Sequence, residues 1–243
     1  MEERLDKILL QRGLVSSRVR AEQLIREVGV KVNGKLITKT GKKFPLDCSI
    51  DMIAEENPWV SRGAYKLLES IEKFNPDIEA KTVLDIGSST GGFTEVLLHH
   101  GAKRVFAVDV GSNQLHPKLR IDNRVVSLEK THVRDLTSKL IPEYCDACVI
   151  DVSFISLEKV FPFLHPFLKQ DAWIIALLKP QFELGKENLG KGGIVKNKAL
   201  YPELIDRIAS IGALNNLEFL EYVPSPILGG DGNEEFLLHF KRI

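Results

Sequence analysis

Apolar residues follow two different spacings near the start of the chain. They first recur at helical intervals and then alternate with polar residues at every second position. This pattern predicts helices at residues 4–10 and 17–25, followed by a β-hairpin at 28–37. The pair Asn33-Gly34 lies at the expected tip, where it favours the tight two-residue turn of a hairpin.

From residue 60 onward, short apolar runs alternate with segments of helical spacing. Strands are expected at 82–86, 104–109, 125–128, 148–154 and 173–179, with helices at 60–70, 93–100, 157–167 and 201–211. A last pair, 217–222 and 235–241, is expected to be antiparallel. This order predicts a doubly wound α/β sheet, in which ligands bind beyond the carboxyl ends of the strands.

A glycine-rich loop follows the first of these strands. It reads Asp85-Ile-Gly-Ser-Ser-Thr-Gly-Gly-Phe-Thr94, and Asp109 closes the next strand, where a carboxylate can accept hydrogen bonds from a ribose. The glycine spacing matches neither the dinucleotide fingerprint nor a P-loop. Asp85 would repel a pyrophosphate but could hold an ammonium or a sulfonium group. The loop therefore favours S-adenosylmethionine, with an ordinary βαβ turn as the structural alternative.

Composition excludes several classes of protein. The chain has 243 residues, enough for one large domain and a small one, and its longest strongly apolar run, 172–178, is too short for a membrane helix. Since the first residues are polar, we expect a cytoplasmic protein without stable membrane insertion. The cysteines Cys145 and Cys148 lack a second pair or nearby histidines, so we expect buried strand residues and no metal site. No feature indicates an oligomeric state.

The formal net charge of zero hides an asymmetry. Residues 1–46 contain 11 Lys or Arg and 5 Asp or Glu, whereas residues 47–243 contain 22 and 28. A basic end of this kind is typical of a segment that meets a polyanion, although a solvated face is the simpler alternative.

The basic segment resembles a known RNA-binding module. The run RLDKILLQRGLVSSRVRAEQLIREVGVKVNGK is similar to the S4 domain, in which a helix pair and a hairpin form a basic face for structured RNA. Phosphate contacts supply affinity and register whatever the base sequence. The resemblance implies such contacts by Arg4, Arg18, Arg20, Lys31 and Lys35. Asp6 and Arg18 could instead form a surface ion pair.

Five ordered motifs in the rest of the chain resemble the FtsJ-type ribose 2'-O-methyltransferases. They are Ser61-Arg-Gly-Ala-Tyr-Lys66, the loop from Asp85 to Thr94, Ile150-Asp-Val-Ser-Phe-Ile155, Leu178-Lys-Pro-Gln-Phe-Glu183 and Gly232-Asn-Glu-Glu-Phe236. Combined with an S4-like segment, they resemble the TlyA branch, some members of which have been called haemolysins. The resemblance implies an S4-like α+β domain at 1–56, a linker at 57–62 and a Rossmann-like, S-adenosylmethionine-dependent methyltransferase domain at 63–243.

The same resemblance implies roles for individual residues. The family's catalytic tetrad falls on Lys66, Asp151, Lys179 and Glu235, with Glu234 as a neighbouring candidate for the last place. Cofactor contacts fall on Asp85, Gly87, Ser88, Ser89, Gly91, Gly92, Phe93 and Asp109, with Asp135 as an adenine partner. Arg62 is a further candidate for RNA contact. The branch methylates cytidine ribose in ribosomal RNA, so the implied partner is rRNA in ribosomal subunits or assembly intermediates.

The expected chemistry assigns the role of base to Lys179. A sulfonium methyl group is already electrophilic, so the protein chiefly has to align a 2'-hydroxyl and remove its proton. A lysine does this only when its pKa is lowered, which burial and the charge of Lys66 favour and Asp151 opposes. The sequence leaves open which effect wins.

Other functions remain to be weighed. Asp151-Val-Ser-Phe154 lacks the Pro-Pro-Tyr that an adenine N6-methylating enzyme would carry at that place, and Cys148, the candidate nucleophile of a cytosine C5 enzyme, lies in an expected buried strand. The two alternatives outside these classes are a pore-forming cytolysin and a ribosome assembly factor without catalytic activity.

Overall fold

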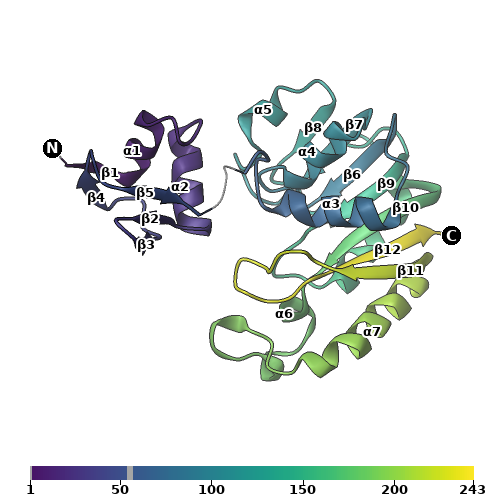
Figure 1. The fold of residues 1–243 in the computed structure, drawn as a ribbon. Helices are drawn as coiled ribbons and strands as arrows, with labels where there is room; N and C mark the ends of the chain where they lie inside the picture. The colour runs from purple at the N-terminus through teal and green to yellow at the C-terminus, as the bar shows by residue number, and fades with distance from the viewer. Residues whose placement is uncertain (1, 54–56) are drawn as a thin grey trace. The chain divides into compact units, whose positions relative to one another are not determined.

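The computed structural model describes residues 2–53 and 57–243 and divides the chain into two compact units, Met1–Pro58 and Trp59–Ile243 (Figure 1). The predicted linker at 57–62 spans this division. Within the described ranges, no helix is long and apolar enough to cross a membrane.

The described residues of the first unit form two helices and five short strands. The elements are β1 (Glu2–Arg4), α1 (Leu5–Gln11), α2 (Arg18–Glu27), β2 (Val30–Val32), β3 (Lys35–Ile37), β4 (Lys43–Pro45) and β5 (Ile50–Met52). Strand β2 pairs antiparallel with β3 and β5, and β1 pairs with β4. Asn33 and Gly34 have φ of 50° and 75°, as the predicted two-residue turn requires. The helices and hairpin are confirmed; β1, β4 and β5, of three residues each, were not predicted.

A buried carboxylate links the start of this unit to its second helix. The side chain of Asp6 is fully buried and accepts hydrogen bonds from Arg4 Nε at 2.9 Å and from Arg18 Nε at 2.6 Å. Burial works to raise the pKa of Asp6, but the two guanidinium groups outweigh it and lower that pKa to about 2. The ion pair of Asp6 and Arg18 expected at the surface therefore forms, with its carboxylate inside the unit.

The second unit is built on a seven-stranded sheet. Its strands are β6 (Thr82–Ile86), β7 (Arg104–Val108), β8 (Val125–Leu128), β9 (Cys145–Ile150), β10 (Leu168–Leu178), β11 (Leu217–Pro224) and β12 (Phe236–Arg242). The spatial order is β11-β12-β10-β9-β6-β7-β8. Strands β6 to β10 are parallel, and β12 is antiparallel to both β10 and β11. The predicted Rossmann-like architecture is confirmed.

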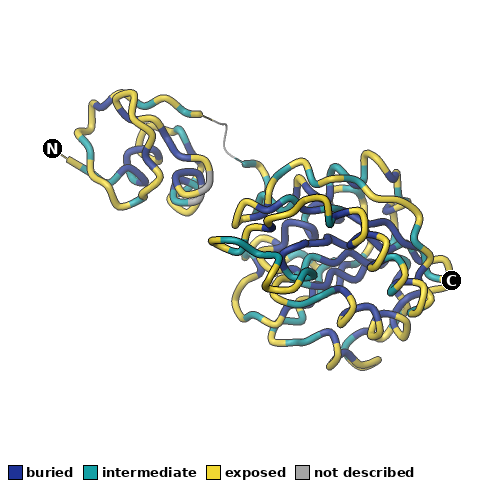
Figure 2. The backbone as a smooth tube through the Cα atoms, turned by 90° about the horizontal axis from the view of Figure 1, so that it is seen from below, coloured by how far each residue is buried: buried dark blue, intermediate teal, exposed yellow. Residues whose placement is uncertain are grey.

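Successive side chains along each strand point to opposite faces of the sheet, and both faces carry apolar side chains. Val83 faces a cluster that includes helices α3 (Gly63–Phe74) and α4 (Gly92–His99), whereas Leu84 faces the cluster that includes helix α7 (Tyr201–Leu214). Figure 1 shows α3 and α4 on one side of the sheet and α7 on the other, and Figure 2 shows buried residues at the centre of the unit. Such burial contributes roughly 1.5–3 kcal/mol for each fully enclosed Val or Leu.

The helix predicted at residues 157–167 does not form. Residues 157–167 form three separate 3-10 turns, η2 (Leu157–Lys159), η3 (Phe161–Phe163) and η4 (His165–Phe167). Pro162 and Pro166 stand in the last two turns, and proline has no amide hydrogen to donate to an α-helical ladder. The apolar spacing still packs Leu157, Phe161 and Leu164 against the sheet, which explains why the pattern resembled a helix.

Short elements connect the remaining strands. They are η1 (Val133–Asp135), α5 (Pro117–Arg120), α6 (Pro180–Glu183), η5 (Lys186–Asn188), η6 (Lys191–Gly193) and η7 (Lys198–Leu200). The fourth predicted strand was placed too far along the chain, since β9 covers Cys145–Ile150 and ends before Asp151. Both Cys145 and Cys148 are fully buried in it, as predicted.

Replacing Asp6 by asparagine tests the buried ion-pair cluster of the first unit. Because the pKa of Asp6 lies below its usual 3.8 in the folded state, the carboxylate stabilises the unit above pH 4 and this contribution is lost as the pH falls towards 2. Asp6→Asn should therefore lower protection of the α1 and α2 amides at pH 7, by an amount on the order of 1 kcal/mol. Hydrogen exchange followed by mass spectrometry measures this.

The difference between Asp6→Asn and the unchanged protein should shrink at pH 2 to 3. Equal protection of α1 and α2 in both proteins at pH 7 would show that the cluster contributes nothing to the unit's stability.

Candidate functional site

The parallel strands bring four predicted features to one rim of the sheet. The glycine loop follows β6, Asp109 follows β7, Asp151 follows β9 and Lys179 follows β10. Since neighbouring parallel strands end at the same edge, residues far apart in sequence meet there. The rim is therefore the place to look for a ligand site.

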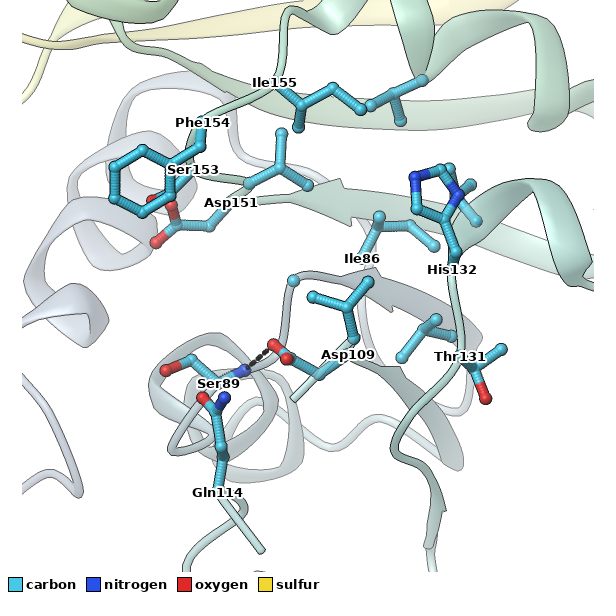
Figure 3. Close-up of a pocket in the computed structure, with 16 residues that line it drawn as sticks. Ile86, Ser89, Asp109, Gln114, Thr131, His132, Asp151, Ser153, Phe154 and Ile155 are labelled. Carbon is cyan, nitrogen blue, oxygen red and sulfur yellow. Dashed lines mark hydrogen bonds between the residues drawn. The ribbon is translucent and has the colours of Figure 1, made fainter. Parts of the chain in front are cut away.

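A cavity of about 310 Å³ opens at this rim (Figure 3). The glycine loop and Asp109 lie on one side of it, and Phe154 and Ile155 lie on the other. A third group, which includes Thr131 and His132, comes from the segment after β8. The full lining is Ile86, Gly87, Ser89, Val108, Asp109, Val110, Gln114, Thr131, His132, Val133, Asp151, Val152, Ser153, Phe154, Ile155 and Val160.

Asp109 is held in place by backbone amides. Its Oδ2 accepts a hydrogen bond from the Ser89 amide at 2.8 Å, drawn in Figure 3, and its Oδ1 accepts one from the Gly111 amide at 2.7 Å. A carboxylate has about four lone-pair positions, so lone pairs remain for a ligand hydroxyl. Gly87, with φ of 84°, lets the loop approach β9, because a Cβ atom there would lie 2.3 Å from the Asp151 carbonyl oxygen.

Asp85 lies behind the loop and is not among the residues that line the cavity. It is fully buried, and Thr94 Oγ1 donates a hydrogen bond of 2.6 Å to its Oδ2. Among the described residues, Asp85 Oδ1 has no hydrogen-bond partner. Burial raises the pKa of Asp85 to about 7, although the hydrogen bond from Thr94 opposes the increase. The geometry gives this residue a position that supports the loop.

The other predicted cofactor residues divide into two groups. Gly87, Ser89 and Asp109 line the cavity. Ser88, Gly91, Gly92 and Phe93 lie outside its lining: Gly91 has φ of 96° and caps α4, and Phe93 is buried in the α4 cluster. Asp135 is exposed and lies 3.7 Å from Arg134. Gln114, Thr131 and His132, which do line the cavity, carry no sequence signal because they stand in connections of no regular pattern.

A second cavity, of about 510 Å³, contains three of the four predicted tetrad residues. Lys66 Nζ lies 2.5 Å from Glu235 Oε2, and Lys179 Nζ lies 2.5 Å from Asp151 Oδ1. Lys179 also donates a hydrogen bond of 2.9 Å to Ser153 Oγ. The lining consists of Lys66, Ser153, Phe154, Lys179, Gln181, Phe182, Leu189, Gly192, Gly193, Gly230, Asp231 and Glu235.

The structure distinguishes the two neighbouring glutamates. Glu235 is 3% exposed and pairs with Lys66, whereas the partly exposed Glu234 pairs with Lys198. Burial raises the pKa of Glu235, and the charge of Lys66 opposes that increase. Ions this well enclosed persist only when paired, and removing one partner typically costs roughly 3–5 kcal/mol.

Asn233, part of the motif at 232–236 but given no role by the sequence, fastens a second glycine-rich segment, residues 185–196, to the loop before β12. Its Oδ1 accepts a hydrogen bond of 2.9 Å from the Val195 amide, and its Nδ2 donates one of 3.0 Å to the Gly193 carbonyl. The segment also closes on itself, because the Gly190 amide donates to the Ile194 carbonyl at 2.7 Å.

The basic residues of the first unit differ in their surroundings. Arg4 and Arg18 both contact Asp6 and Glu22. Lys31 and Lys35 are exposed on the β2 and β3 hairpin, and Arg20 is partly exposed in α2. In the second unit, Arg62 stands immediately before α3, four residues from Lys66.

The sheet order, the glycine loop and the rim cavity define a Rossmann-like methyltransferase fold. The N-methyltransferase NodS from Bradyrhizobium japonicum, solved with S-adenosyl-L-homocysteine, shares this fold at 16% identity with a TM-score of 0.51, covering 76% of this chain and 88% of that one. The models of the FtsJ-like methyltransferase family and the S4 domain match residues 59–242 and 3–45. The chain belongs to the FtsJ-like methyltransferase family and carries an S4 domain.

Several relatives match almost the whole chain. The 16S/23S rRNA (cytidine-2'-O)-methyltransferase TlyA of Mycobacterium tuberculosis is 40% identical over 97% of this chain and 88% of its own length. Hemolysin A of Brachyspira hyodysenteriae is 37% identical over 98% of this chain and 99% of its own. The family membership predicted from the five motifs and the S4-like run is confirmed.

Asp85→Asn should change how stability depends on pH. An acid whose pKa is higher in the folded state keeps its proton there while the unfolded chain releases it, so Asp85 makes the protein less stable as the pH rises from about 4 to about 7. The neutral asparagine removes this loss. In urea unfolding of the cofactor-free protein, the variant should match the unchanged protein at pH 4 and exceed it by an amount on the order of 1–3 kcal/mol at pH 8. A constant difference at all pH values would contradict the assignment.

Asn233→Ala should release the glycine-rich segment without unfolding the unit. The change removes two hydrogen bonds, each contributing about 1 kcal/mol, so the segment should open roughly 30-fold more often. Limited trypsin digestion should then cut faster after Lys186, Lys191 and Lys196. The control is Asn215→Ala at the end of α7, which should leave these cuts unchanged; equal cutting in Asn233→Ala would disprove the fastening role.

Proposed function

We propose that this chain transfers the methyl group of S-adenosylmethionine to the 2'-hydroxyl of a cytidine ribose in ribosomal RNA. The main observation behind this proposal is the position of Lys179, whose Nζ contacts Asp151 and Ser153. Asp151 lines the first cavity, Lys179 lines the second, and Ser153 and Phe154 line both. A donor in one cavity and an acceptor in the other would meet at this amino group.

The first cavity suits the cofactor. Asp109 retains lone pairs for ribose hydroxyls, the Gly87 and Ser89 backbone borders the cavity closely, and Ile155 and Val160 offer apolar surface to an adenine. Asp151 adds a negative charge beside the site, which complements a sulfonium cation. When bound, the cofactor supplies an electrophilic methyl group and leaves as a neutral thioether.

The second cavity suits the acceptor ribose. Lys179, as a neutral amine, is the group proposed to take the proton from the 2'-hydroxyl and so become an ammonium, and Asp151 and Ser153 hold its amino group in position. Lys66 and Glu235 form the other ion pair at this cavity and can donate to and accept from ribose oxygens. Their fixed geometry aligns the acceptor, which is the main catalytic requirement for a methyl donor of this reactivity.

The acceptor is proposed from the relatives and from the first unit. The M. tuberculosis relative is named for cytidine 2'-O-methylation of 16S and 23S rRNA. The S4 domain exposes Lys31 and Lys35, which can contact phosphates and hold a ribosomal subunit or an assembly intermediate against the protein. With this role we expect the protein to act in the cytoplasm.

Lys179→Ala tests the mechanism. The variant should bind S-adenosylmethionine as tightly as the unchanged protein in calorimetry, because Lys179 does not line the cofactor cavity. It should transfer labelled methyl groups to ribosomal particles at least about 100-fold more slowly, the usual loss for a missing general base. The control is Lys169→Ala. Lys169 lies at the start of β10 and pairs with Asp146. Full activity of Lys179→Ala, or transfer to a base instead of a ribose, would refute the proposal.

The two alternative functions, a cytolysin and a non-catalytic assembly factor, predict different results with the same purified protein. A cytolysin would lyse erythrocytes whether or not Lys179 is present, and a non-catalytic assembly factor would bind ribosomal particles but not labelled S-adenosylmethionine. The paired and buried Lys66, Glu235 and Lys179 favour the enzyme, because a protein without catalysis has no need to enclose these charges.

A further inference from the structure

A second carboxylate lines the acceptor cavity in addition to Glu235. Asp231 lines that cavity together with Lys66, Lys179 and Glu235. It borders Gly229 on the same side as Glu235, since a Cβ atom on Gly229 would fall 2.5 Å from Glu235 Oε1 and 3.1 Å from Asp231 Oδ1. A side chain at residue 229 would therefore fill the space between the two carboxylates.

Two neighbours fix the orientation of the Asp231 carboxylate. Gln181 Nε2 donates a hydrogen bond of 3.2 Å to Asp231 Oδ2, and the Asn233 amide donates one of 3.4 Å to Oδ1. Gln181 is only 7% exposed and comes from α6, directly after Lys179, so it ties Asp231 to the strand that carries the base. The carboxylate itself remains exposed to the cavity. The Asp231 carboxylate is therefore held in position, and it keeps acceptor lone pairs for a further hydrogen bond.

The chemistry of this position discriminates between the two pyrimidines. An ionised carboxylate accepts hydrogen bonds and donates none. Cytosine carries an exocyclic amino group, N4, that donates, whereas uracil carries at the same place a carbonyl, O4, that only accepts. With the ribose held by Lys66, Lys179 and Glu235, a base in the same cavity would bring one of these groups to Asp231. The carboxylate would attract N4 and repel O4.

We propose that Asp231, positioned by Gln181, selects cytidine by accepting a hydrogen bond from the exocyclic amino group of the target base. This inference rests on the proposed function and assigns its base specificity to one residue. It explains how a site that recognises a ribose, which all nucleotides share, can prefer one pyrimidine.

The test compares two forms of the same ribosomal particle. Once the methylated residue has been mapped, particles are prepared with cytidine or uridine at that position, and kcat/KM for labelled methyl transfer is measured on each. The unchanged protein should prefer cytidine by a factor on the order of tenfold or more. Asp231→Asn replaces the carboxylate by an amide that can present either a donor or an acceptor. Its preference should fall to nearly one, with faster transfer to the uridine particle than the unchanged protein achieves.

The gain on uridine separates a specificity residue from a damaged one, because a misfolded variant loses activity on both particles. Glu234→Gln is the matched control: this carboxylate is in the same loop, pairs with Lys198 and does not line the cavity, so the preference should be unchanged. An Asp231→Asn variant with the original preference, or an unchanged protein that accepts uridine as readily as cytidine, would overturn the inference. If the unchanged protein methylates no ribose in any ribosomal particle, the proposed function itself fails.

Discussion

The parallel pairing of β6, β9 and β10 is the constraint on which the rest of the site depends. Because these three strands are neighbours and run the same way, the glycine loop, Asp151 and Lys179 emerge at one edge. Strand β12 runs in the opposite direction beside β10, with Phe236 opposite Leu178. Its first residues therefore lie where β10 ends, which brings Glu235 to the same rim. One antiparallel strand among parallel ones is what completes the set of four charged groups.

Enclosed charges are arranged in pairs throughout the second unit's site. Lys66 with Glu235 and Lys179 with Asp151 each neutralise a charge that would otherwise be costly to bury. Two buried acids differ from these pairs: Asp109 is held by backbone amides, and Asp85 accepts a hydrogen bond from a threonine hydroxyl while its pKa rises to about 7. Neighbouring Asp151 and Asp109 add to this rise by their own charges. The acids of the rim thus influence one another, and the chemistry of the site is distributed over several strands.

The first unit uses the same ion-pairing principle for another purpose. Asp6 is more deeply buried than Lys66, Lys179 and Glu235, but its two arginine partners lower its pKa and connect β1 and α1 to α2. Arg4 and Arg18 consequently combine two possible roles, since one side of each guanidinium is engaged by Asp6 and both side chains remain partly exposed. In contrast, Lys31 and Lys35 are exposed on the hairpin, where their charge is directed to solvent or a ligand.

The sequence by itself determined the class of fold, the hairpin at Asn33 and Gly34, the strand ends that carry Asp109 and Lys179, and the family. These features depend on local spacing, on turn chemistry and on motifs, all of which are written along the chain. It failed at residues 157–167, where two prolines interrupt a helical apolar pattern, and it did not separate Asp85 from the residues that line the cavity.

Only the tertiary structure decided which charges are partners. It paired Lys66 with Glu235 across 169 positions of sequence, paired Glu234 with Lys198, and placed Asp231 and Gln181 together in the second cavity. Such contacts follow from the insertion of β12 between β10 and β11. The physical reason is that ion pairs form between whatever groups the packed sheet brings within a few ångströms, and no local pattern encodes that distance.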